Sequence, residues 1–404
     1  MEKINNADNK IYDVIIIGAG ASGLFAAAKS SPLNGLILEK TSRPGTKLLM
    51  SGSGQCNITH AGSIKDFVSC YGDKGKTIRS CLYKHNNLEL MDFLSSNGVE
   101  VFTREDGKVF PVSLDAHDVL YMLLRRAKKN GFELKCESEV TGVELAEGLW
   151  QISCDNTVYK ARNVIIATGG CSYPTTGSDG SFFNVLRSCL DIEITELKPS
   201  LAPIQVNEYP YSELSGISFE KVQTSIWDKS DKKKAETCED LLFTHKDLSG
   251  PAVINISKHA VQGEKLKINY LYPLNYEKVL DKLKQAFHGA KGSPANIMAA
   301  EFDLPKRFCQ LFAARHGEAL KNLARALTGE EFIINSVSGF NKAMATSGGI
   351  DLKQIDTATF GFKRHPGLYA IGEALDVDGI TGGYNLQFAY SSARTAIRDI
   401  CAQI

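Results

Sequence analysis

The segment that most constrains this chain is Tyr12 to Gly23, which reads Tyr-Asp-Val-Ile-Ile-Ile-Gly-Ala-Gly-Ala-Ser-Gly. Its continuous apolar run predicts a buried parallel strand, and Leu24 to Lys29 predicts the helix that follows. Gly18 permits a tight turn, Gly20 lets the backbone approach a pyrophosphate, and Gly23 lets helix and strand pack closely. The free N–H groups at the start of the helix would face the phosphates. This pattern predicts a dinucleotide-binding domain.

A second apolar strand, Gly35 to Leu38, ends in Glu39. A carboxylate about 20 residues after the first glycine is placed to accept hydrogen bonds from a ribose hydroxyl. The residues that we expect to hold the nucleotide in this first part of the chain are Gly18, Ala19, Gly20, Ala21, Ser22, Gly23, Glu39 and Lys40.

Length and charge limit the class of protein. A chain of 404 residues is expected to form two or three domains. The 46 basic and 46 acidic residues cancel, so no overall field attracts nucleic acid or an anionic membrane. No apolar stretch approaches the roughly 20 residues of a membrane span, and the polar N-terminus does not resemble a signal peptide. We therefore expect a cytoplasmic protein with a small-molecule substrate, without nucleic-acid or membrane partners; the oligomeric state stays open.

The ten cysteines form no C-x-x-C pair and no metal-ligand pattern. We expect reduced thiols and no metal site. Cys56 lies in a loop close to the predicted nucleotide site, and packing as a small buried hydrophobe is the favoured interpretation.

Two later segments favour FAD over NAD. Asn163 to Gly170 and Gly367 to Leu375 are apolar strands that end in Ala-Thr-Gly-Gly and Gly-Glu-Ala-Leu, and both suit the same nucleotide-binding sheet. A simple NAD dehydrogenase needs neither, whereas glutathione-reductase-like flavoproteins place the acid of such a Gly-Glu strand end near the flavin ribityl and phosphate groups. FAD is therefore the predicted cofactor. The residues expected at these strand ends are Ala167, Thr168, Gly169, Gly372, Glu373 and Asp376.

A glycine-rich turn, Gly382 to Gln387, precedes a closing helix that we expect over Phe388 to Arg398. Backbone N–H groups at such a helix start commonly face the flavin pyrimidine edge, where reduced flavin carries negative charge. A simple loop–helix connection is the alternative. The residues assigned to the cofactor here are Gly383, Tyr384, Asn385 and Leu386.

Four longer strings carry a family resemblance: Gly45–Asn57, Phe243–Pro251, Ala345–Ile350 and Gly372–Gln387. Together they resemble the bacterial BaiN-like flavoproteins of the glutathione-reductase-like superfamily, which include aminoacetone oxidase and a bile-acid-pathway reductase. The resemblance implies an α/β fold, in which a Rossmann-like FAD-binding domain carries an inserted β-rich domain and a small helical domain. Gln55 departs from the family, whose members usually carry Arg there, so the charge for an anion contact is missing.

The patterns along the chain agree with this division. Alternating apolar residues after residue 192 indicate antiparallel strands, and apolar residues at helical spacing follow from Tyr276 to about Leu327. The expected parts are an FAD-binding domain in two pieces (1–191 and 346–404), a β-rich domain (192–275), a helical domain (276–330) and a return strand of the β-rich domain (331–345).

The loop after the second strand is expected to cross the cofactor pyrophosphate and the flavin edge. Its cofactor candidates are Lys47, Ser51, Gly52, Ser53, Gly54 and Asn57. Lys47 is a cation suited to flavin N5 or to a phosphate. Tyr173 and Tyr384 are candidates for walling the substrate side. His245 is a candidate because histidine is the side chain most often used for proton transfer. The candidates for catalysis are thus Lys47, Tyr173, His245 and Tyr384, and the sequence does not choose among them.

Two motifs that the sequence lacks limit the reactions that we expect. It has no second strand–G-x-G-x-x-G–helix unit and no C-x-x-C, which excludes a thioredoxin-reductase-like enzyme. We favour an NAD(P)H-linked reductase of an activated C=C bond, such as a steroid- or bile-acid-like enone, with NADH or NADPH as a transient donor. The alternatives are an oxygen-dependent oxidase of a small amine such as aminoacetone, and a non-catalytic flavoprotein that binds a partner.

Overall fold

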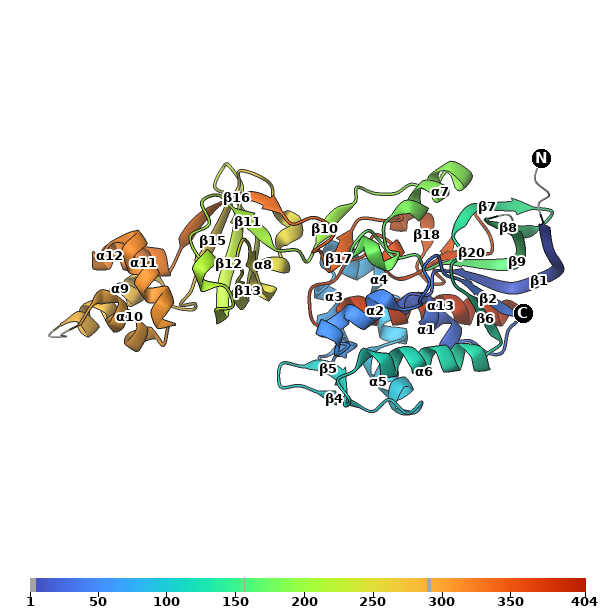
Figure 1. Ribbon diagram of the computed structural model, residues 1–404, viewed down its shortest axis with the longest axis horizontal. Coiled ribbons are helices and arrows are strands. Elements are labelled where there is room, and N and C mark those ends of the chain that lie inside the picture. The colour runs from blue at the N-terminus through green and yellow to red at the C-terminus, as the bar shows by residue number, and fades with distance from the viewer. Residues whose placement is uncertain (1–4, 156, 289–291) are drawn as a thin grey trace. The chain divides into compact units, whose positions relative to one another are not determined.

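A computed structural model describes residues 5–155, 157–288 and 292–404, and the chain divides into two compact units (Figure 1). Unit 1 comprises Met1–Lys198 and Ala345–Ile404, and unit 2 comprises Pro199–Met344. Unit 2 is therefore an insertion in the chain of unit 1. The chain passes between them at β10 (Lys198–Ser200) and β17 (Ala345–Ser347).

Unit 1 is built on a nine-stranded sheet whose central strands are parallel. Val14 to Ile17 are almost completely buried, as a continuous apolar strand requires. The parallel strands lie in the order β20 (Leu368–Ala370), β9 (Thr157–Ile166), β1 (Asn5–Ile17), β2 (Gly35–Leu38) and β6 (Phe132–Lys135). The antiparallel strands are β7 (Val140–Ala146), β8 (Leu149–Cys154), β18 (Ile355–Asp356) and β19 (Gly361–Phe362). The carboxyl ends of the parallel strands meet at one edge, where such sheets bind ligands.

Three helices pack together beside this sheet: α1 (Ala21–Lys29), α6 (Ala116–Lys129) and α13 (Tyr384–Gln403) (Figure 1). The buried Asn130 joins the end of α6 to α1, because its amide donates to the carbonyls of Ala27 and Ala28 at 3.0 Å each. The other elements of unit 1 are α2 (Thr46–Met50), η1 (Ser51–Gly54), β3 (Thr59–His60), α3 (Ile64–Ser69), η2 (Gly72–Lys74), α4 (Gly75–Lys84), α5 (Asn87–Ser95), β4 (Val101–Thr103), β5 (Lys108–Pro111), η3 (Pro174–Thr176), α7 (Ser181–Leu190), η6 (Leu352–Gln354) and η7 (Gly372–Ala374).

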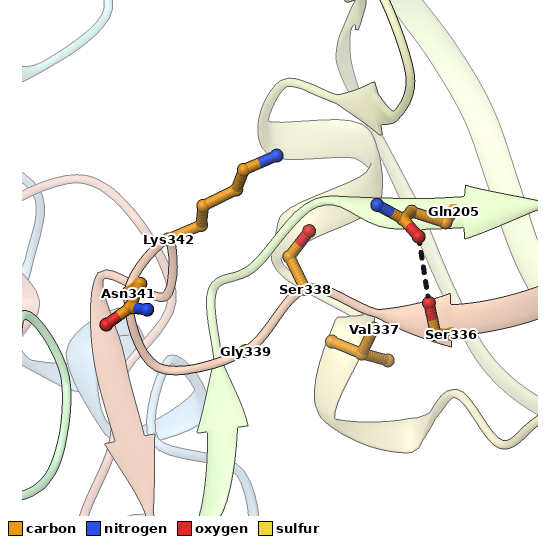
Figure 2. Close-up of a pocket in the computed structure, with 7 residues that line it drawn as sticks. All are labelled: Gln205, Ser336, Val337, Ser338, Gly339, Asn341 and Lys342. Carbon is orange, nitrogen blue, oxygen red and sulfur yellow. Dashed lines mark hydrogen bonds between the residues drawn. The ribbon is translucent and has the colours of Figure 1, made fainter.

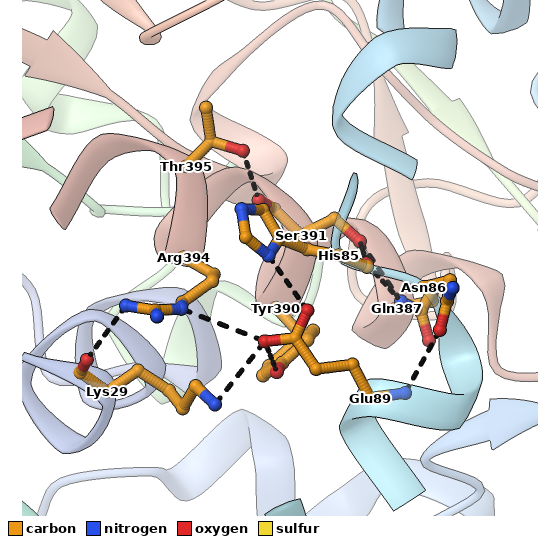
Figure 3. A network of polar contacts seen from close by, with 9 residues as sticks. All are labelled: Lys29, His85, Asn86, Glu89, Gln387, Tyr390, Ser391, Arg394 and Thr395. Atoms are coloured by element: carbon orange, nitrogen blue, oxygen red, sulfur yellow. Dashed lines mark hydrogen bonds and ion pairs between the residues drawn. The ribbon is translucent and has the colours of Figure 1, made fainter. Parts of the chain in front are cut away.

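A polar network around Glu89 ties α5 to α1 and α13 (Figure 3). The Glu89 carboxylate lies 2.8 Å from Nδ1 of His85 and accepts a hydrogen bond of 2.8 Å from Tyr390. Lys29 and Arg394 add cations at 3.4 and 3.7 Å. Burial alone would raise the pKa of Glu89, but the hydrogen bonds and cations outweigh it and lower that pKa to about 2.

Unit 2 contains a closed barrel of six strands in the order β11-β14-β13-β12-β15-β16. Its elements are β11 (Ile204–Val206), η4 (Ser212–Leu214), β12 (Ser218–Trp227), β13 (Lys233–Phe243), β14 (Leu248–Ser249), α8 (Pro251–Ile254), η5 (Ser257–His259), β15 (Lys265–Asn269), α9 (Tyr276–Phe287), α10 (Pro294–Phe302), α11 (Lys306–His316), α12 (Leu320–Leu327) and β16 (Glu330–Val337). The barrel and the helices share one core, in which Phe308 of α11 packs on Phe219 and Tyr270.

The first domain boundary differs from the expected one. Residues 192–198, which we expected in the β-rich domain, belong to unit 1. Thr195 N donates to Gly349 O at 2.9 Å, and the Gln354 amide donates to Glu193 O at 2.8 Å. These bonds hold the segment to the C-terminal part of unit 1. No helix in the described part of the chain is both long and apolar enough to cross a membrane.

Candidate functional site

The turn between β1 and α1 shows why its glycines occupy their positions. Gly18 has φ +102°, and a Cβ there would lie 2.5 Å from the Ala167 carbonyl oxygen. A Cβ on Gly23 would lie 2.1 Å from the Gly18 oxygen. Gly20 differs, since no atom lies within 4 Å of the position that its Cβ would take. Gly18 and Gly23 are therefore required by packing, whereas Gly20 borders open space that fits an approaching pyrophosphate.

Glu39 lies buried at the end of β2 and faces this turn. One carboxylate oxygen accepts a hydrogen bond of 2.8 Å from Ala19 N, and the other accepts from the N and Oγ1 of Thr41 at 2.9 and 2.7 Å. Each carboxylate oxygen has two lone pairs, so capacity for a ribose hydroxyl remains. Lys40 instead pairs with Asp179 at 2.6 Å.

A buried hydroxyl beside Gly169 also fits a nucleotide. The Ser178 side chain is buried, and its Oγ has no hydrogen-bond partner among the described residues. It lies 2.8 Å from the position that a Cβ on Gly169 would take, and Gly169 itself has φ +73°. Because buried polar groups are usually paired, a bound nucleotide would supply what Ser178 lacks. Together with Gly20 and Glu39, this residue fits FAD at the edge where β1, β2 and β9 end.

Lys47 and Glu373 form an ion pair at the same edge. Lys47 Nζ lies 2.6 Å from Glu373 Oε2 and 2.5 Å from Ser172 Oγ. Glu373 Oε1 accepts hydrogen bonds of 2.8 Å from Ser172 Oγ and from Thr346 N. The network fastens together the segments that follow β2, β9 and β20. Ser172 and Thr346 were missed by sequence reasoning, although Ser172 comes just after the Ala-Thr-Gly-Gly strand end.

The loop around η1 has an unusual backbone. Gly52, Ser53, Gly54 and Cys56 all have positive φ. Cys56 is fully buried, and burial raises the pKa of its thiol to about 12, so it packs as a protonated hydrophobe, as predicted. With its amide oriented so that both groups are satisfied, Asn57 accepts from Gly383 N at 3.2 Å and donates to Thr59 O at 3.1 Å. Asn57 thereby joins this loop to the start of α13.

α13 begins at Tyr384, whereas the sequence predicted its start at Phe388, so the side chains that hold the preceding turn lie in the first turn of the helix. Asn385 accepts from Gly379 N at 2.8 Å and donates to Gly379 O at 3.0 Å. Gly383 has φ +92°, and Tyr384 stacks on His60 with ring centroids 5.5 Å apart. Leu386 is half-buried, one residue before Gln387. The fully buried Gln387, which sequence reasoning did not assign, accepts from Thr59 Oγ1 at 2.7 Å. These bonds fix the helix start whose free N–H groups we expect to face the flavin.

Asp376 is a second buried acid close to the end of β20. Lys74 Nζ lies 2.5 Å from its Oδ2, and Gly348 N donates to its Oδ1 at 3.2 Å. It therefore joins η2 to the loop after β17. The assignment of Asp376 to the cofactor stays a prediction, and so do the assignments of the other residues at the carboxyl edge of the sheet.

The four catalytic candidates come from both units of the chain. Lys47, Tyr173 and Tyr384 belong to unit 1, and His245 lies exposed on the turn between β13 and β14 of unit 2. Tyr173 has φ +53° in the loop before η3. Among the described residues, no group of three or more His, Cys, Asp or Glu side chains is arranged to hold a metal ion.

The parallel sheet and the glycine-containing β1–α1 turn are typical of Rossmann-like FAD-binding oxidoreductases. Within that class, the HI0933-like protein Rossmann domain matches residues 12–399, and the chain belongs to this family. The resemblance to BaiN-like flavoproteins and the predicted fold class are confirmed. The protein is an FAD-dependent oxidoreductase.

Two relatives span almost the whole chain. The ribosomal RNA dihydrouridine synthase of Haemophilus influenzae is 30% identical over 411 residues, covering 96% of this chain and 98% of that protein. The 3-dehydro-bile acid delta(4,6)-reductase of Clostridium scindens is 28% identical over 409 residues, covering 95% and 97%.

Solved structures show the same fold at low identity. The E. coli quinol fumarate reductase subunit FrdA has a TM-score of 0.52 at 15% identity, covering 98% of this chain and 70% of that one. A 3-ketosteroid delta1-dehydrogenase from Sterolibacterium denitrificans has a TM-score of 0.52 at 12% identity, covering 98% and 100%.

Proposed function

We propose that this protein is an NAD(P)H-linked, FAD-dependent reductase that saturates a carbon–carbon double bond conjugated with a carbonyl group. We propose further that its substrate is uridine in ribosomal RNA. The observation that carries the proposal is the similarity to the Haemophilus dihydrouridine synthase along 96% of the chain. Dihydrouridine is uridine whose ring C=C bond has been reduced. That bond is conjugated with a ring carbonyl, so it is an activated alkene.

The bile-acid reductase supports the same reaction class with a different substrate. Its name describes removal of double bonds conjugated with the 3-oxo group of a steroid. Both relatives therefore support reduction of an activated alkene, which was the reaction favoured from the sequence. The RNA substrate departs from our expectation that no nucleic acid is bound. Zero net charge argues against long-range steering, but local contacts to phosphate and sugar need only a few side chains.

The residues of unit 1 have defined tasks in this proposal. The β1–α1 turn and Glu39 would hold the adenosine diphosphate part of FAD, and the Lys47–Glu373 pair would hold together the strand ends beside the flavin. When bound, FAD supplies hydride transfer to the alkene. The net reaction adds a hydride and a proton across the C=C bond, and the oxidation of NAD(P)H to NAD(P)+ supplies the electron pair.

The test is anaerobic reduction of the purified holoprotein by NADH or NADPH, followed by incubation with unmodified ribosomal RNA. Nucleoside mass spectrometry would then detect dihydrouridine. Fast flavin bleaching by a pyridine nucleotide, slow reoxidation by oxygen and formation of dihydrouridine are the expected results.

A 3-oxo-4,6-dienone steroid is incubated in parallel. If only the steroid is reduced, the reductase class stands and the RNA substrate is wrong. If neither nucleotide bleaches the flavin and oxygen reoxidises it rapidly after chemical reduction, the protein is an oxidase and the proposal is wrong.

A further inference from the structure

Unit 2 has a pocket at the end of β16 with a volume of about 300 Å³ (Figure 2). Its lining includes the side chains of Gln205, Ser336, Ser338, Asn341 and Lys342. All five carry N–H or O–H donors, and among the described residues that line it none is acidic or aromatic. The donors of this lining suit an oxygen-rich ligand.

Several of these donors are not used by the protein itself. Ser338 is 93% buried (7% exposed), and its Oγ has no hydrogen-bond partner among the described residues. Gln205 Oε1 accepts from Ser336 Oγ at 3.1 Å, so the amide nitrogen is the group that this side chain can offer as a donor to a ligand. Figure 2 shows this nitrogen and the Ser338 hydroxyl pointing toward the same space. A buried hydroxyl without a partner is costly, and a ligand oxygen would remove that cost.

Lys342 is held in place at the same pocket. Its Nζ lies 2.8 Å from Oδ2 of Asp247, whose side chain is only 4% exposed. An ammonium group has three donors, so two remain for a ligand. Because Asp247 balances the charge of Lys342, the pocket offers fixed hydrogen-bond donors with little net charge.

Lysine, serine, asparagine and glutamine side chains are the groups that contact phosphate oxygens and sugars in nucleic-acid complexes. We propose that this pocket binds the phosphate and sugar of a nucleotide, which rests on the proposed function. Two sources share this chemistry: the ribosomal RNA chain and the NAD(P)H donor.

The experiment uses the full-length holoprotein and a fluorescently labelled oligouridylate, with fluorescence anisotropy as the readout. Lys342→Ala is expected to weaken binding about five- to tenfold, because it removes the ammonium donors offered to the phosphate. Ser338→Ala, which removes the unpaired hydroxyl, is expected to weaken it by a smaller factor. The matched control is Lys246→Ala, because Lys246 is an exposed lysine of the same unit outside the pocket lining. Asp247→Asn is expected to tighten binding, since it leaves the charge of Lys342 unbalanced.

NADPH titrations of the same variants, followed by flavin bleaching, identify the source. If Lys342→Ala weakens only the oligouridylate, the pocket takes the RNA chain; if it weakens only NADPH, the pocket takes the donor. Equal affinities of wild type, Lys342→Ala and Lys246→Ala for both probes would overturn the pocket proposal. If Lys342→Ala weakens binding of a probe but the wild type forms no dihydrouridine, the pocket proposal is supported and the proposed reaction is overturned. The two failures are therefore distinguishable.

Discussion

At the scale of single residues, the three glycines of the β1–α1 turn separate into two kinds. Gly18 has a positive φ, and a Cβ there would collide with the Ala167 carbonyl, so the fold itself requires a glycine at this position. Gly20 has φ −77° and open space where a Cβ would point, so nothing in the protein alone requires a glycine there. The sequence pattern assigns all three glycines to one motif. In the structure, packing within the protein requires Gly18 and Gly23, whereas at Gly20 only an approaching ligand would require a glycine.

This difference predicts two separate outcomes. Gly20→Val is expected to fold with an unchanged melting temperature of the apoprotein and to lose at least tenfold in FAD affinity, because its side chain would occupy the pyrophosphate space. Gly18→Ala is expected to destabilise the protein by about 1–3 kcal/mol, from backbone strain and the contact with Ala167. Flavin absorbance after gel filtration and thermal unfolding measure the two effects. Full flavin content in Gly20→Val would show that the nucleotide site is wrongly placed.

The Lys47–Glu373 pair could not be predicted from the sequence. Both residues stand in strings that indicated the cofactor site, but 326 positions separate them along the chain. The sequence pattern predicts which strand each residue follows. It does not predict which side chain each of them contacts. Their pairing, with Ser172 Oγ and Thr346 N as additional donors to Glu373, depends on which strand ends become neighbours.

The pair predicts coupling between two substitutions. Lys47→Met and Glu373→Gln are each expected to destabilise the apoprotein by about 1–3 kcal/mol, because each leaves a partly buried group without its partner. The double variant should lose less than the sum, with a coupling of about 1–2 kcal/mol. Denaturant unfolding of the four proteins measures this, and strict additivity would contradict the interaction. Lys47→Arg should recover part of the loss.

At the scale of elements, the sequence predicts the parallel strands well because each is a short apolar run that ends in a recognisable turn. The four apolar runs around Val14, Leu36, Val164 and Leu368 form β1, β2, β9 and β20, respectively. In the sheet, β1 pairs with β2 and β9, and β9 pairs with β20, all in parallel. The small sheet of β3, β4 and β5 was not predicted, because its strands have two to four residues and no clear alternation. Short elements of this kind are fixed by tertiary neighbours rather than by their own residues.

The Glu89 network predicts a pH dependence at this scale. The pKa of Glu89 is about 2 in the folded protein against 4.5 as its ordinary value. Because the folded pKa is lower, the network stabilises the fold above pH 4.5, and this contribution is lost as the pH falls from 4.5 toward 2. Glu89→Gln is therefore expected to cost about 1–2 kcal/mol at neutral pH, allowing for the 31% exposure of the side chain, and to flatten the stability profile in that window.

Urea unfolding at a series of pH values measures this profile. Asp92→Asn provides the control, because Asp92 is an exposed carboxylate on the same helix, α5. A Glu89→Gln profile as steep as that of the wild type between pH 4.5 and 2 would show that the network does not stabilise the fold as the geometry indicates.

At the scale of the whole molecule, the residues assigned to FAD all lie in unit 1 although they come from both ends of the chain. The two chain segments that lead into and out of unit 2 are joined within unit 1, because Thr195 bonds to Gly349 and Ile194 forms a β-bridge with Ile350. Unit 2 has its own barrel and its own buried core. An insertion of this kind requires that unit 1 keep its sheet without any strand from unit 2.

Two fragments test that independence. Unit 1 with Pro199–Met344 replaced by a short glycine–serine linker is expected to fold and bind FAD, since Thr195 and Gly349 already hold the ends of the deleted segment together. Unit 2 alone is expected to unfold cooperatively without flavin, because its closed barrel leaves no strand edge that unit 1 must cover. Flavin absorbance and thermal unfolding of the two fragments measure these outcomes. A linked unit 1 that folds but binds no FAD would show that residues of the insertion belong to the cofactor site, which would move the search for catalytic groups to His245 and its neighbours.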